Sequence, residues 1–405
     1  MRHPHPLLTT EEVAERLGVK PATIYAYVSR GQLRSLRNAD GKGSLFARSD
    51  VEAFEASRKR TTTPVIQTGI TLIKDGQLYY RGRDAVVLAA TEEFEAVSAL
   101  LWTGDFDSAP FPINREMVDL ARRATQPLPE SARLTDRLRV TVAAVAAADP
   151  LRFDTTPAAV VATGRQLLST MVHALPARAA LPTGAAPPTR AALPAEPVPL
   201  AEALWYRLTP EEPTAASLRA LSAALVLLAD HDIAASTLAA RIAASTRAHP
   251  YAVVSAGLAA LDGPLHGAAS ALAYPLLADA MIDPVATISH RLRAATSSGT
   301  VAGFGHPLYP EGDPRATALF ALLSGPAVDT AEQLGATMRT RSGVLPNIDL
   351  ALAALTLSYG MPPDAGEAIF AVARTAGWLA HALEEYADRP LRYRPSGRYA
   401  GESPT

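Results

Sequence analysis

The stretch from Leu218 to Thr246 constrains the fold more than any other part of the sequence; it reads LRALSAALVLLADHDIAASTLAARIAAST. A helix that is apolar on almost every side has to be covered by other elements, because no face of it suits water. The charged group Asp230-His231-Asp232 interrupts this stretch, and we expect the helix to break there, since buried charge is costly unless it is paired or used. Alanine and leucine dominate the chain and runs of β-branched residues are short, so we predict mainly helical structure.

Length and composition exclude several kinds of site. A chain of 405 residues can hold two or three domains and a sizeable core. The formal net charge is −2, so the chain as a whole has no bias toward polyanions, and without cysteine it has no disulfide, thiolate metal site or thiol nucleophile. No apolar run approaches the roughly 20 residues that span a bilayer, and the N-terminus lacks an apolar secretory core. We therefore expect a cytoplasmic protein that does not enter a membrane.

Three turn-like motifs between Asp262 and Asp349 carry the side chains best suited to chemistry. They are GPLHG around His266, GFGHPLYPEGDPR around His306 and Arg315, and PNID, which ends at Asp349. Gly, Pro and Asn suit turns and helix ends, where a polar side chain can face a cleft. Two histidines and a carboxylate can move protons in both directions near neutral pH, and an arginine can bind a carboxylate in a forked geometry. The residue types suggest proton abstraction beside a carbonyl on an acid-bearing substrate, although spacing alone does not bring them together.

The segments GPLHGAAS, GFGHPLYPEGDPRA and PNIDLALAAL resemble, in this order, motifs of the citrate synthase family, which includes 2-methylcitrate synthases. Further similarities are the hairpin and helix of IKDGQLYYRG and LLWTG, where we expect a structural role for Arg81, and the segments ADHDIAAST, ARTAGWLAHALE and RPSGRYAG. The resemblance covers about residues 64 to 402. It implies a mainly α, two-domain citrate synthase fold over residues 61–405, with a small subdomain at about 267–353, and an obligate homodimer with sites between the domains.

The same resemblance implies a role for each matching residue. Asp349 would take a proton from the methyl group of acetyl-CoA, His266 would stabilise the enol, and His306 would donate a proton or hydrogen bond to the ketone of oxaloacetate. The residues that would hold oxaloacetate are His231, Arg315, Arg374 and, from the neighbouring subunit, Arg394. Arg389 and Arg392 are alternatives to Arg394. No metal or cofactor is implied, and acetyl-CoA or propionyl-CoA would be a substrate.

Two departures from the family pattern concern the CoA side of the expected site. Bacterial relatives usually read GHRVYK where this chain reads GHPLYP, so Pro307 and Pro310 remove two basic side chains from a place that contacts CoA phosphates. Ala268 and Ser270 replace a glycine and an asparagine near His266. The sequence therefore predicts oxaloacetate-like binding more firmly than efficient acetyl-CoA turnover. It does not distinguish acetyl-CoA from propionyl-CoA.

Residues 1–60 form a separate module with the pattern of a winged helix–turn–helix. Thr9 or Thr10 can cap a first helix through EEVAERL, Gly18 ends it, and Pro21 starts the next helix. A hairpin wing and a third helix from Ser49 follow. The segments TTEEVAERLGVKPATIYAYVSRGQL and ARSDVEAF resemble excisionase- and MerR-like domains, in which the second helix enters the major groove and the wing touches the DNA backbone.

The resemblance makes residues 1–60 a candidate DNA-binding module. Lys and Arg outnumber Asp and Glu there, which favours contact with phosphates. The second helix offers only hydroxyls and aromatic rings, however, so a degenerate module used for docking or dimerisation stays an alternative. The candidate DNA contacts are Lys20, Thr23, Tyr25, Arg30, Arg34, Arg37 and Lys42.

The remaining segments show no obvious chemistry. Residues 56–64 form a polar, basic linker, residues 105–180 contain no polar cluster and are assigned to scaffold, and residues 180–200 form an Ala/Pro-rich exposed loop. Two functions are open at this point. One is an enzyme that condenses an acyl-CoA with oxaloacetate, and the other is a metabolite-sensing transcription regulator on the same fold. A regulator has no need of a base at Asp349, so its presence favours the enzyme.

Overall fold

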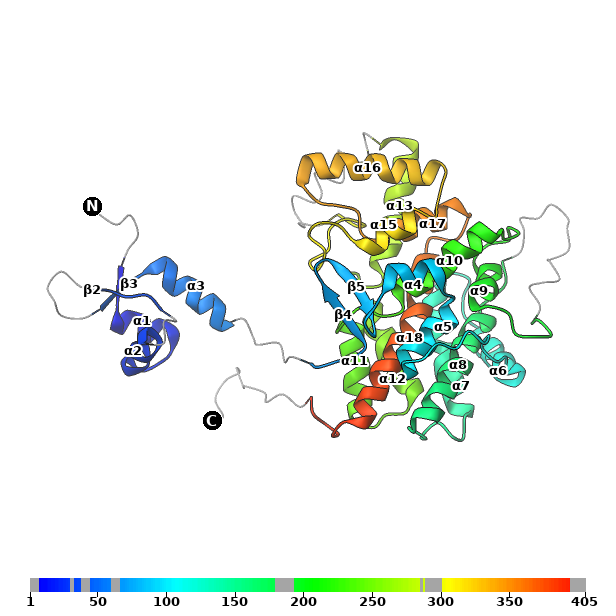
Figure 1. Cartoon of the computed structure of the whole chain (residues 1–405), viewed down its shortest axis with the longest axis horizontal. Helices are drawn as coiled ribbons and strands as arrows, with labels where there is room; N and C mark the ends of the chain where they lie inside the picture. The colour runs from blue at the N-terminus through cyan, green and yellow to red at the C-terminus, as the bar shows by residue number, and fades with distance from the viewer. Residues whose placement is uncertain are drawn as a thin grey trace. The chain divides into compact units, whose positions relative to one another are not determined.

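The computed structural model describes residues 7–29, 33–37, 44–59, 66–178, 193–284, 287 and 301–393 (Figure 1). The chain divides into two compact units, Met1–Gln67 and Thr68–Thr405. None of the described helices combines the length and the apolarity needed to cross a bilayer.

The first unit is a small three-stranded sheet packed with three helices. Its strands pair antiparallel in the order β1-β3-β2. Val13, Ile24, Phe46 and Val51 are fully buried and form its core. The elements are β1 (Leu7–Thr9), α1 (Thr10–Leu17), α2 (Pro21–Ser29), β2 (Leu36–Arg37), β3 (Ser44–Ala47) and α3 (Arg48–Lys59).

The start of α1 confirms the predicted cap. Thr9 accepts a hydrogen bond from the backbone N–H of Glu12, and the Glu12 side chain accepts one from the backbone N–H of Thr9. Gly18 ends the helix in the left-handed conformation. The third helix begins at Arg48, one residue before the predicted start, and the tip of the predicted wing lies outside the described residues.

The second unit is helical apart from one small sheet, β4-β5-β6, as predicted. Its strands are β4 (Thr71–Lys74), β5 (Gln77–Tyr80) and β6 (Arg83–Asp84). Its first helices are α4 (Ala85–Thr91), α5 (Phe94–Thr103), α6 (Arg115–Thr125), α7 (Leu134–Ala148), α8 (Pro157–Ala174), α9 (Leu200–Leu208) and α10 (Ala215–Leu228). The later helices are α11 (Ala235–Ser245), α12 (Pro250–Leu261), α13 (Ala269–Ile282), α15 (Pro314–Phe320), α16 (Pro326–Ser342), α17 (Ile348–Ser358) and α18 (Ala365–Ala387).

The hairpin of β4 and β5 fastens the first residues of this unit onto its core. Asp75 and Gly76 both have positive φ, as a tight two-residue hairpin turn requires. Tyr80 is buried, and its hydroxyl donates to the carbonyl of Asp230 at 2.9 Å. Arg81 donates two hydrogen bonds to the carbonyl of Leu101, which is consistent with the structural role expected for it.

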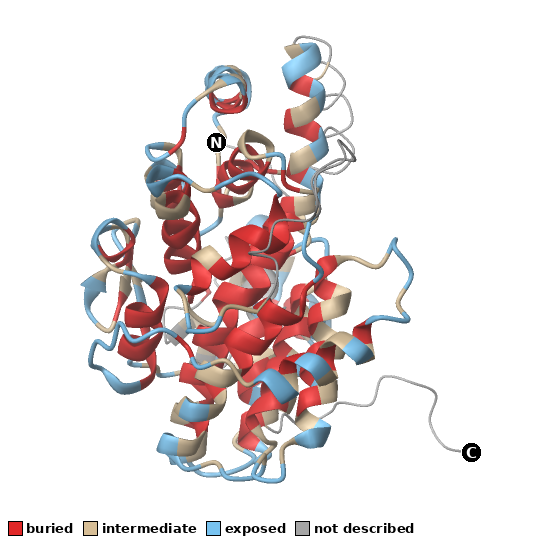
Figure 2. Ribbon diagram, turned by 90° about the vertical axis from the view of Figure 1, so that its right-hand side faces the viewer, coloured by how far each residue is buried: buried red, intermediate tan, exposed pale blue. Residues whose placement is uncertain are grey.

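Helix α18 is the centre of the second unit. It packs against α5, α7, α8, α10, α11, α12 and α13, and Figure 2 shows the buried residues concentrated in the inner helices. A side chain at Gly257 of α12 would meet the ring of Trp378 at 2.4 Å, so glycine permits the close approach of α12 and α18. An apolar helix of this kind is stable only inside such a bundle.

The predicted break in the apolar stretch 218–246 is confirmed. Helix α10 ends at Leu228 and α11 begins at Ala235. Between them Asp230 is fully buried, and it accepts hydrogen bonds from the side chains of Thr71 and His381. His231 follows it on the side of the cavity described below.

Helices α13, α15, α16 and α17 gather at the top of the second unit in Figure 1. They pack on one another through α13 with α16 and α17, and through α17 with α15 and α16. These helices begin at Ala269 and end at Ser358, so the last of them extends beyond the range 267–353 that was predicted to form a small subdomain. Their layer carries His306, Arg315 and Asp349 toward the helices below it.

Candidate active site

Six of the residues singled out from the sequence line one cavity of about 780 Å³. They come from the loop after α10, the turn before α13, the loop before α15, and helices α15, α17 and α18. Three motifs that are separated by up to about a hundred residues thus meet in space. The six residues are His231, His266, His306, Arg315, Asp349 and Arg374.

Two short segments pair to place His306 and Asp349 on the same wall. The N–H of Gly305 donates to the carbonyl of Leu345 at 2.8 Å, and the N–H of Asn347 donates to the carbonyl of Gly303 at 2.9 Å. The Asn347 side chain donates to the carbonyl of Gly305 at 3.0 Å. Its oxygen also accepts from the N–H of Asp349 at 3.0 Å, so Asn347 caps α17 and ties it to the glycine-rich loop.

The glycines of this loop are required by its backbone. Gly303 and Gly305 both have φ near +80°, a conformation that other residues adopt only with strain. A side chain at Gly303 would also meet the Cβ of Leu350 at 3.0 Å. Larger residues at these two positions would therefore displace His306, which follows directly.

His231, His306 and Tyr309 form a cluster of rings. The two imidazole centroids lie 5.1 Å apart, and the ring of Tyr309 lies 4.9 Å from that of His306. The Tyr309 hydroxyl and Nε2 of His231 share a hydrogen bond of 2.9 Å. Burial raises the pKa of Tyr309 to about 12, so the hydroxyl keeps its proton. Sequence reasoning did not single out Tyr309, although it lies within the GHPLYP motif.

His266 is oriented by Ser236 at the start of α11. Nε2 of His266 lies 2.7 Å from the Ser236 hydroxyl, and the indole N–H of Trp378 donates to the same hydroxyl at 3.2 Å. Because an indole nitrogen is only a donor, this arrangement favours a serine hydrogen directed to Nε2. The proton of neutral His266 is then on Nδ1. Ser236 lies in the AST element of the sequence but was not identified there as a partner of histidine.

Arg315 is neutralised by a carboxylate. Its Nε and one terminal nitrogen donate to Asp313 at 2.9 and 2.8 Å, and both side chains are buried. Burial lowers the pKa of Arg315, but the carboxylate beside it outweighs that effect, so its pKa lies above the ordinary value. Asp313 also caps α15 and accepts from the N–H of Ile348 at 3.0 Å. The sequence Asp-Pro is typical of a helix start, but it does not reveal this pairing.

Arg374, in contrast, is a buried cation without a carboxylate in contact. Its Nε donates to the carbonyl of Leu228 at 2.9 Å, while both terminal nitrogens lack a partner among the described residues. The guanidinium lies 4.7 Å from the ring centroid of Phe370, and burial lowers its pKa to about 10. Because a buried charge is unfavourable unless an ion pairs with it, this arginine suits an anionic ligand in the cavity.

The cavity combines three neutral histidines with an aspartate whose pKa lies near neutral pH. Burial lowers the pKa of His266 and His306 to about 4 and that of His231 further below its ordinary value, so all three rings are neutral at pH 7. Asp349 is half-buried and lines the cavity, and burial raises its pKa to about 7. A carboxylate with that pKa is a stronger base than an ordinary aspartate.

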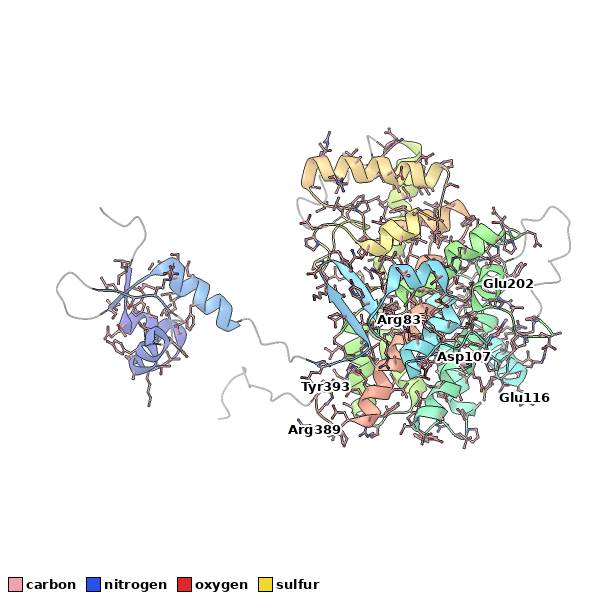
Figure 3. All side chains as sticks on the ribbon, in the orientation of Figure 1. Arg83, Asp107, Glu116, Glu202, Arg389 and Tyr393 are labelled. Atoms are coloured by element: carbon pink, nitrogen blue, oxygen red, sulfur yellow. The ribbon has the colours of Figure 1, made fainter. Side chains whose placement is uncertain are left out.

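The remaining predicted substrate ligand, Arg394, lies outside the described residues. The two alternatives to Arg394, Arg389 and Arg392, follow the C-terminal end of α18. Figure 3 labels Arg389, together with Tyr393, at this end of the helix. Arg392 pairs with the buried Glu385, which leaves less of its charge available for a ligand. Arg389 is exposed. Among the described residues no group of three His, Asp or Glu is arranged to hold a metal ion.

The first unit contains part of the predicted DNA-contact set. Lys20, Tyr25 and Arg34 are exposed, and Thr23 is half-buried. Tyr25 lies on the outward face of α2, with 52% of its surface accessible. Arg30, Lys42 and the side chain of Arg37 lie outside the described part of the chain.

Comparison with known proteins identifies both units. Residues 60–396 match the family model of the citrate synthase C-terminal domain, and residues 7–59 match a helix-turn-helix domain. Citrate synthase of Haloferax volcanii is 32% identical over 353 residues, which cover 81% of this chain and 90% of that protein. A 2-methylcitrate synthase of Mycobacterium tuberculosis is 27% identical over 92% of this chain and 97% of its own length.

Solved structures agree with the described fold. Citrate synthase of Thermoplasma acidophilum, solved in a ternary complex with carboxymethyl coenzyme A and oxaloacetate, has a TM-score of 0.67 at 24% identity. The match covers 86% of this chain and 97% of that one. Citrate synthase of Thermotoga maritima has a TM-score of 0.68 at 24% identity, covering 85% of this chain and 95% of that one. The predicted mainly α fold with an N-terminal helix-turn-helix is confirmed. The chain belongs to the citrate synthase family and carries a helix-turn-helix domain at its N-terminus.

Proposed function

We propose that residues 61–405 condense an acyl-CoA with oxaloacetate in a Claisen-type reaction. The observation that carries this proposal is the set of groups around one cavity. A carboxylate with a pKa of about 7, two neutral imidazoles and an arginine without a carboxylate partner surround the same space. A carbon acid such as the acyl-CoA requires the base and the hydrogen-bond donors, and a dicarboxylate such as oxaloacetate requires the arginine.

Asp349 acts as the base in this proposal. It removes a proton from the carbon next to the thioester carbonyl, and the N–H on Nδ1 of His266 donates to the thioester oxygen as it gains charge. The enol carbon then attacks the ketone of oxaloacetate, and His306 supplies a proton or hydrogen bond to the ketone oxygen. Water finally cleaves the thioester and releases CoA. The proton acceptor is thus an aspartate with a raised pKa, and the hydrogen-bond donors are neutral histidines.

Oxaloacetate would be held mainly by Arg374. Its two terminal nitrogens have no partner among the described residues and match the two oxygens of one carboxylate. His231 and Arg315 line the same space and would contact the remainder of the substrate, with Arg394 of the partner subunit in the proposed homodimer. Pro307 lines the cavity where bacterial relatives usually have a basic residue, so the CoA phosphates gain no charged partner at this position.

Thiol release from acetyl-CoA and from propionyl-CoA, each with oxaloacetate, tests this proposal on the purified protein. Turnover with either substrate supports the condensing enzyme, and the ratio of the two values of kcat/KM distinguishes citrate synthase from 2-methylcitrate synthase. No thiol release with either substrate, together with thermal stabilisation by oxaloacetate, would favour a ligand sensor instead.

The pH dependence of turnover should follow Asp349. Because the base must be deprotonated and its pKa is raised to about 7, kcat/KM should rise with pH through about 7 and level off above it. The measurement is a profile of kcat/KM between roughly pH 5 and 9. An acidic limb near pH 4, the range of an unperturbed aspartate, would contradict the assignment.

Replacing Ser236 with alanine should lower kcat about tenfold, because His266 loses the contact that orients its ring and selects its tautomer. KM for oxaloacetate should change little, since Ser236 does not line the cavity. Threonine keeps a hydroxyl and should restore part of the rate. Equal rates for the alanine variant and the wild type would show that the contact does not matter for catalysis.

We also propose that the first unit binds DNA. The support is its match to a helix-turn-helix domain and the exposure of two side chains, those of Lys20 just before α2 and Tyr25 on α2. Replacing Lys20 with alanine should weaken binding to duplex DNA and lower the salt-dependence slope by about 1. The exposed Glu15, replaced by glutamine, is the control. Binding that is absent, or equally strong in both variants at every salt concentration, would refute the assignment.

A further inference from the structure

A second cavity of about 380 Å³ lies among α6, α7, α8 and α9, far from the candidate active site. Figure 1 shows α6, α7 and α8 at the lower right of the larger unit with α9 above them on the right, whereas α13, α15 and α17 lie at its top. The two cavities share no lining residue. Three guanidinium groups line the second cavity, those of Arg122, Arg137 and Arg207.

None of these three arginines pairs with a carboxylate in the described parts of the chain. Arg122 donates to the carbonyl of His173 at 3.2 and 3.0 Å. Arg137 donates to the carbonyls of Thr125 and Pro129 at 3.2 and 3.1 Å. Arg207 is only 3% exposed, and its Nε is buried with no partner. Backbone carbonyls thus orient Arg122 and Arg137 without neutralising them.

Such a cluster is unfavourable by itself. Burial, with Arg122 nearby, lowers the pKa of Arg207 to about 10. Burial, with Arg207 and Arg122, also lowers the pKa of His173 to about 4, and Nδ1 of that ring lacks a partner. Elsewhere in the described chain, the buried Arg241 and Arg315 pair with the carboxylates of Glu385 and Asp313. The second cavity therefore contains excess positive charge that an anion would relieve.

The chain segment that follows the cavity contains no acidic residue before the exposed Glu196. The sequence from Pro176, which lines the cavity, to Ala195 contains no Asp or Glu. The cavity also has room beside the three cations. We propose that it binds the phosphate group of a small molecule, held by Arg122, Arg137 and Arg207. A phosphate carries up to two negative charges and several acceptor oxygens, which suits several guanidinium groups better than a single carboxylate does.

This cluster was missed in the sequence, where residues 105–180 were assigned to scaffold without a polar cluster. Arg122 and Arg137 are 15 positions apart, and Arg207 follows 70 positions later. No local pattern joins them, since α6, α7 and α9 meet only in the folded bundle. The assignment of residues 105–180 to scaffold stays a prediction, and the proposed phosphate site would be an exception to it.

The test measures binding of inorganic phosphate and of glycerol phosphate to the full-length protein by calorimetry and thermal shift. Wild type should bind and gain thermal stability, and Arg207→Met should weaken binding about tenfold or more. Arg123→Met changes the exposed neighbouring arginine of α6 and should bind as wild type does. Arg374→Met should also bind normally, which separates this cavity from the candidate active site.

A second variant tests the proposal independently, in case Arg207→Met fails to fold. Gln126 is exposed and lines the cavity, so Gln126→Glu places a carboxylate beside the arginines without disturbing the core. It should abolish phosphate binding and raise the melting temperature of the ligand-free protein. Phosphate binding that persists in both variants, or that is absent in wild type, would overturn the proposal. A third result would also overturn the proposal. If wild type bound no phosphate and Arg207→Met changed the oligomeric state, a second copy of the chain would supply the anion.

Discussion

Replacing Asp349 with alanine is expected to lower kcat by about 10²–10⁴-fold, the usual contribution of a positioned general base. The α-proton of a thioester is weakly acidic, and no other carboxylate among the described residues lines the cavity except Asp232 of the loop after α10. Burial raises the pKa of Asp349 to about 7, as a base that acts near neutral pH requires. The variant should still bind oxaloacetate, because Arg374 and His231 are unchanged.

The decisive comparison is between rate and binding. Thiol release measures the rate, and the rise in melting temperature with oxaloacetate measures binding. Asp329→Ala removes an exposed aspartate from α16 and should leave both unchanged. Turnover of the Asp349 variant near the wild-type rate would refute the assignment of the base, whereas loss of both readouts would indicate a folding defect.

The parts of the site that could be predicted are those that local sequence determines. Glycine, proline and asparagine mark the turns before α13, α15 and α17, and the polar residue beside each turn does reach the cavity. The break at Asp230 could be predicted because a continuous apolar helix cannot accommodate three polar residues. In the N-terminal unit, the Thr9 cap and Gly18 stop are likewise encoded within a few residues.

The partnerships could not be predicted, because they join segments that are distant in sequence. Ser236 and His266 are 30 positions apart, and Tyr309 meets His231 across 78 positions. The sequence also presents Arg315 and Arg374 as equivalent carboxylate ligands. Only the fold shows that Asp313 already neutralises Arg315, while Arg374 has both terminal nitrogens without a partner in the described chain.

Because of this difference, we expect the loss of Arg374 to weaken oxaloacetate binding more than the loss of Arg315 would. Replacing Arg374 with methionine should raise the dissociation constant for oxaloacetate at least about 30-fold, equivalent to about 2 kcal/mol, because a charge-assisted contact to a buried carboxylate is lost. Calorimetric titration with oxaloacetate measures the change. Unchanged affinity would mean that the substrate carboxylates are bound elsewhere.

The stability of the ligand-free protein provides the second half of this prediction. Arg374 is a buried charge without a directly bound carboxylate, so its methionine variant should melt at or above the wild-type temperature. Arg241 is the matched control, since it is equally buried but pairs with Glu385 at 2.5 Å and Glu384 at 2.8 Å. Arg241→Met removes the cation beside both carboxylates, leaves Glu385 paired with Arg392 alone, and should cost about 3 kcal/mol. If Arg374→Met destabilised the ligand-free protein as much as Arg241→Met, Arg374 would be a structural cation rather than a substrate ligand.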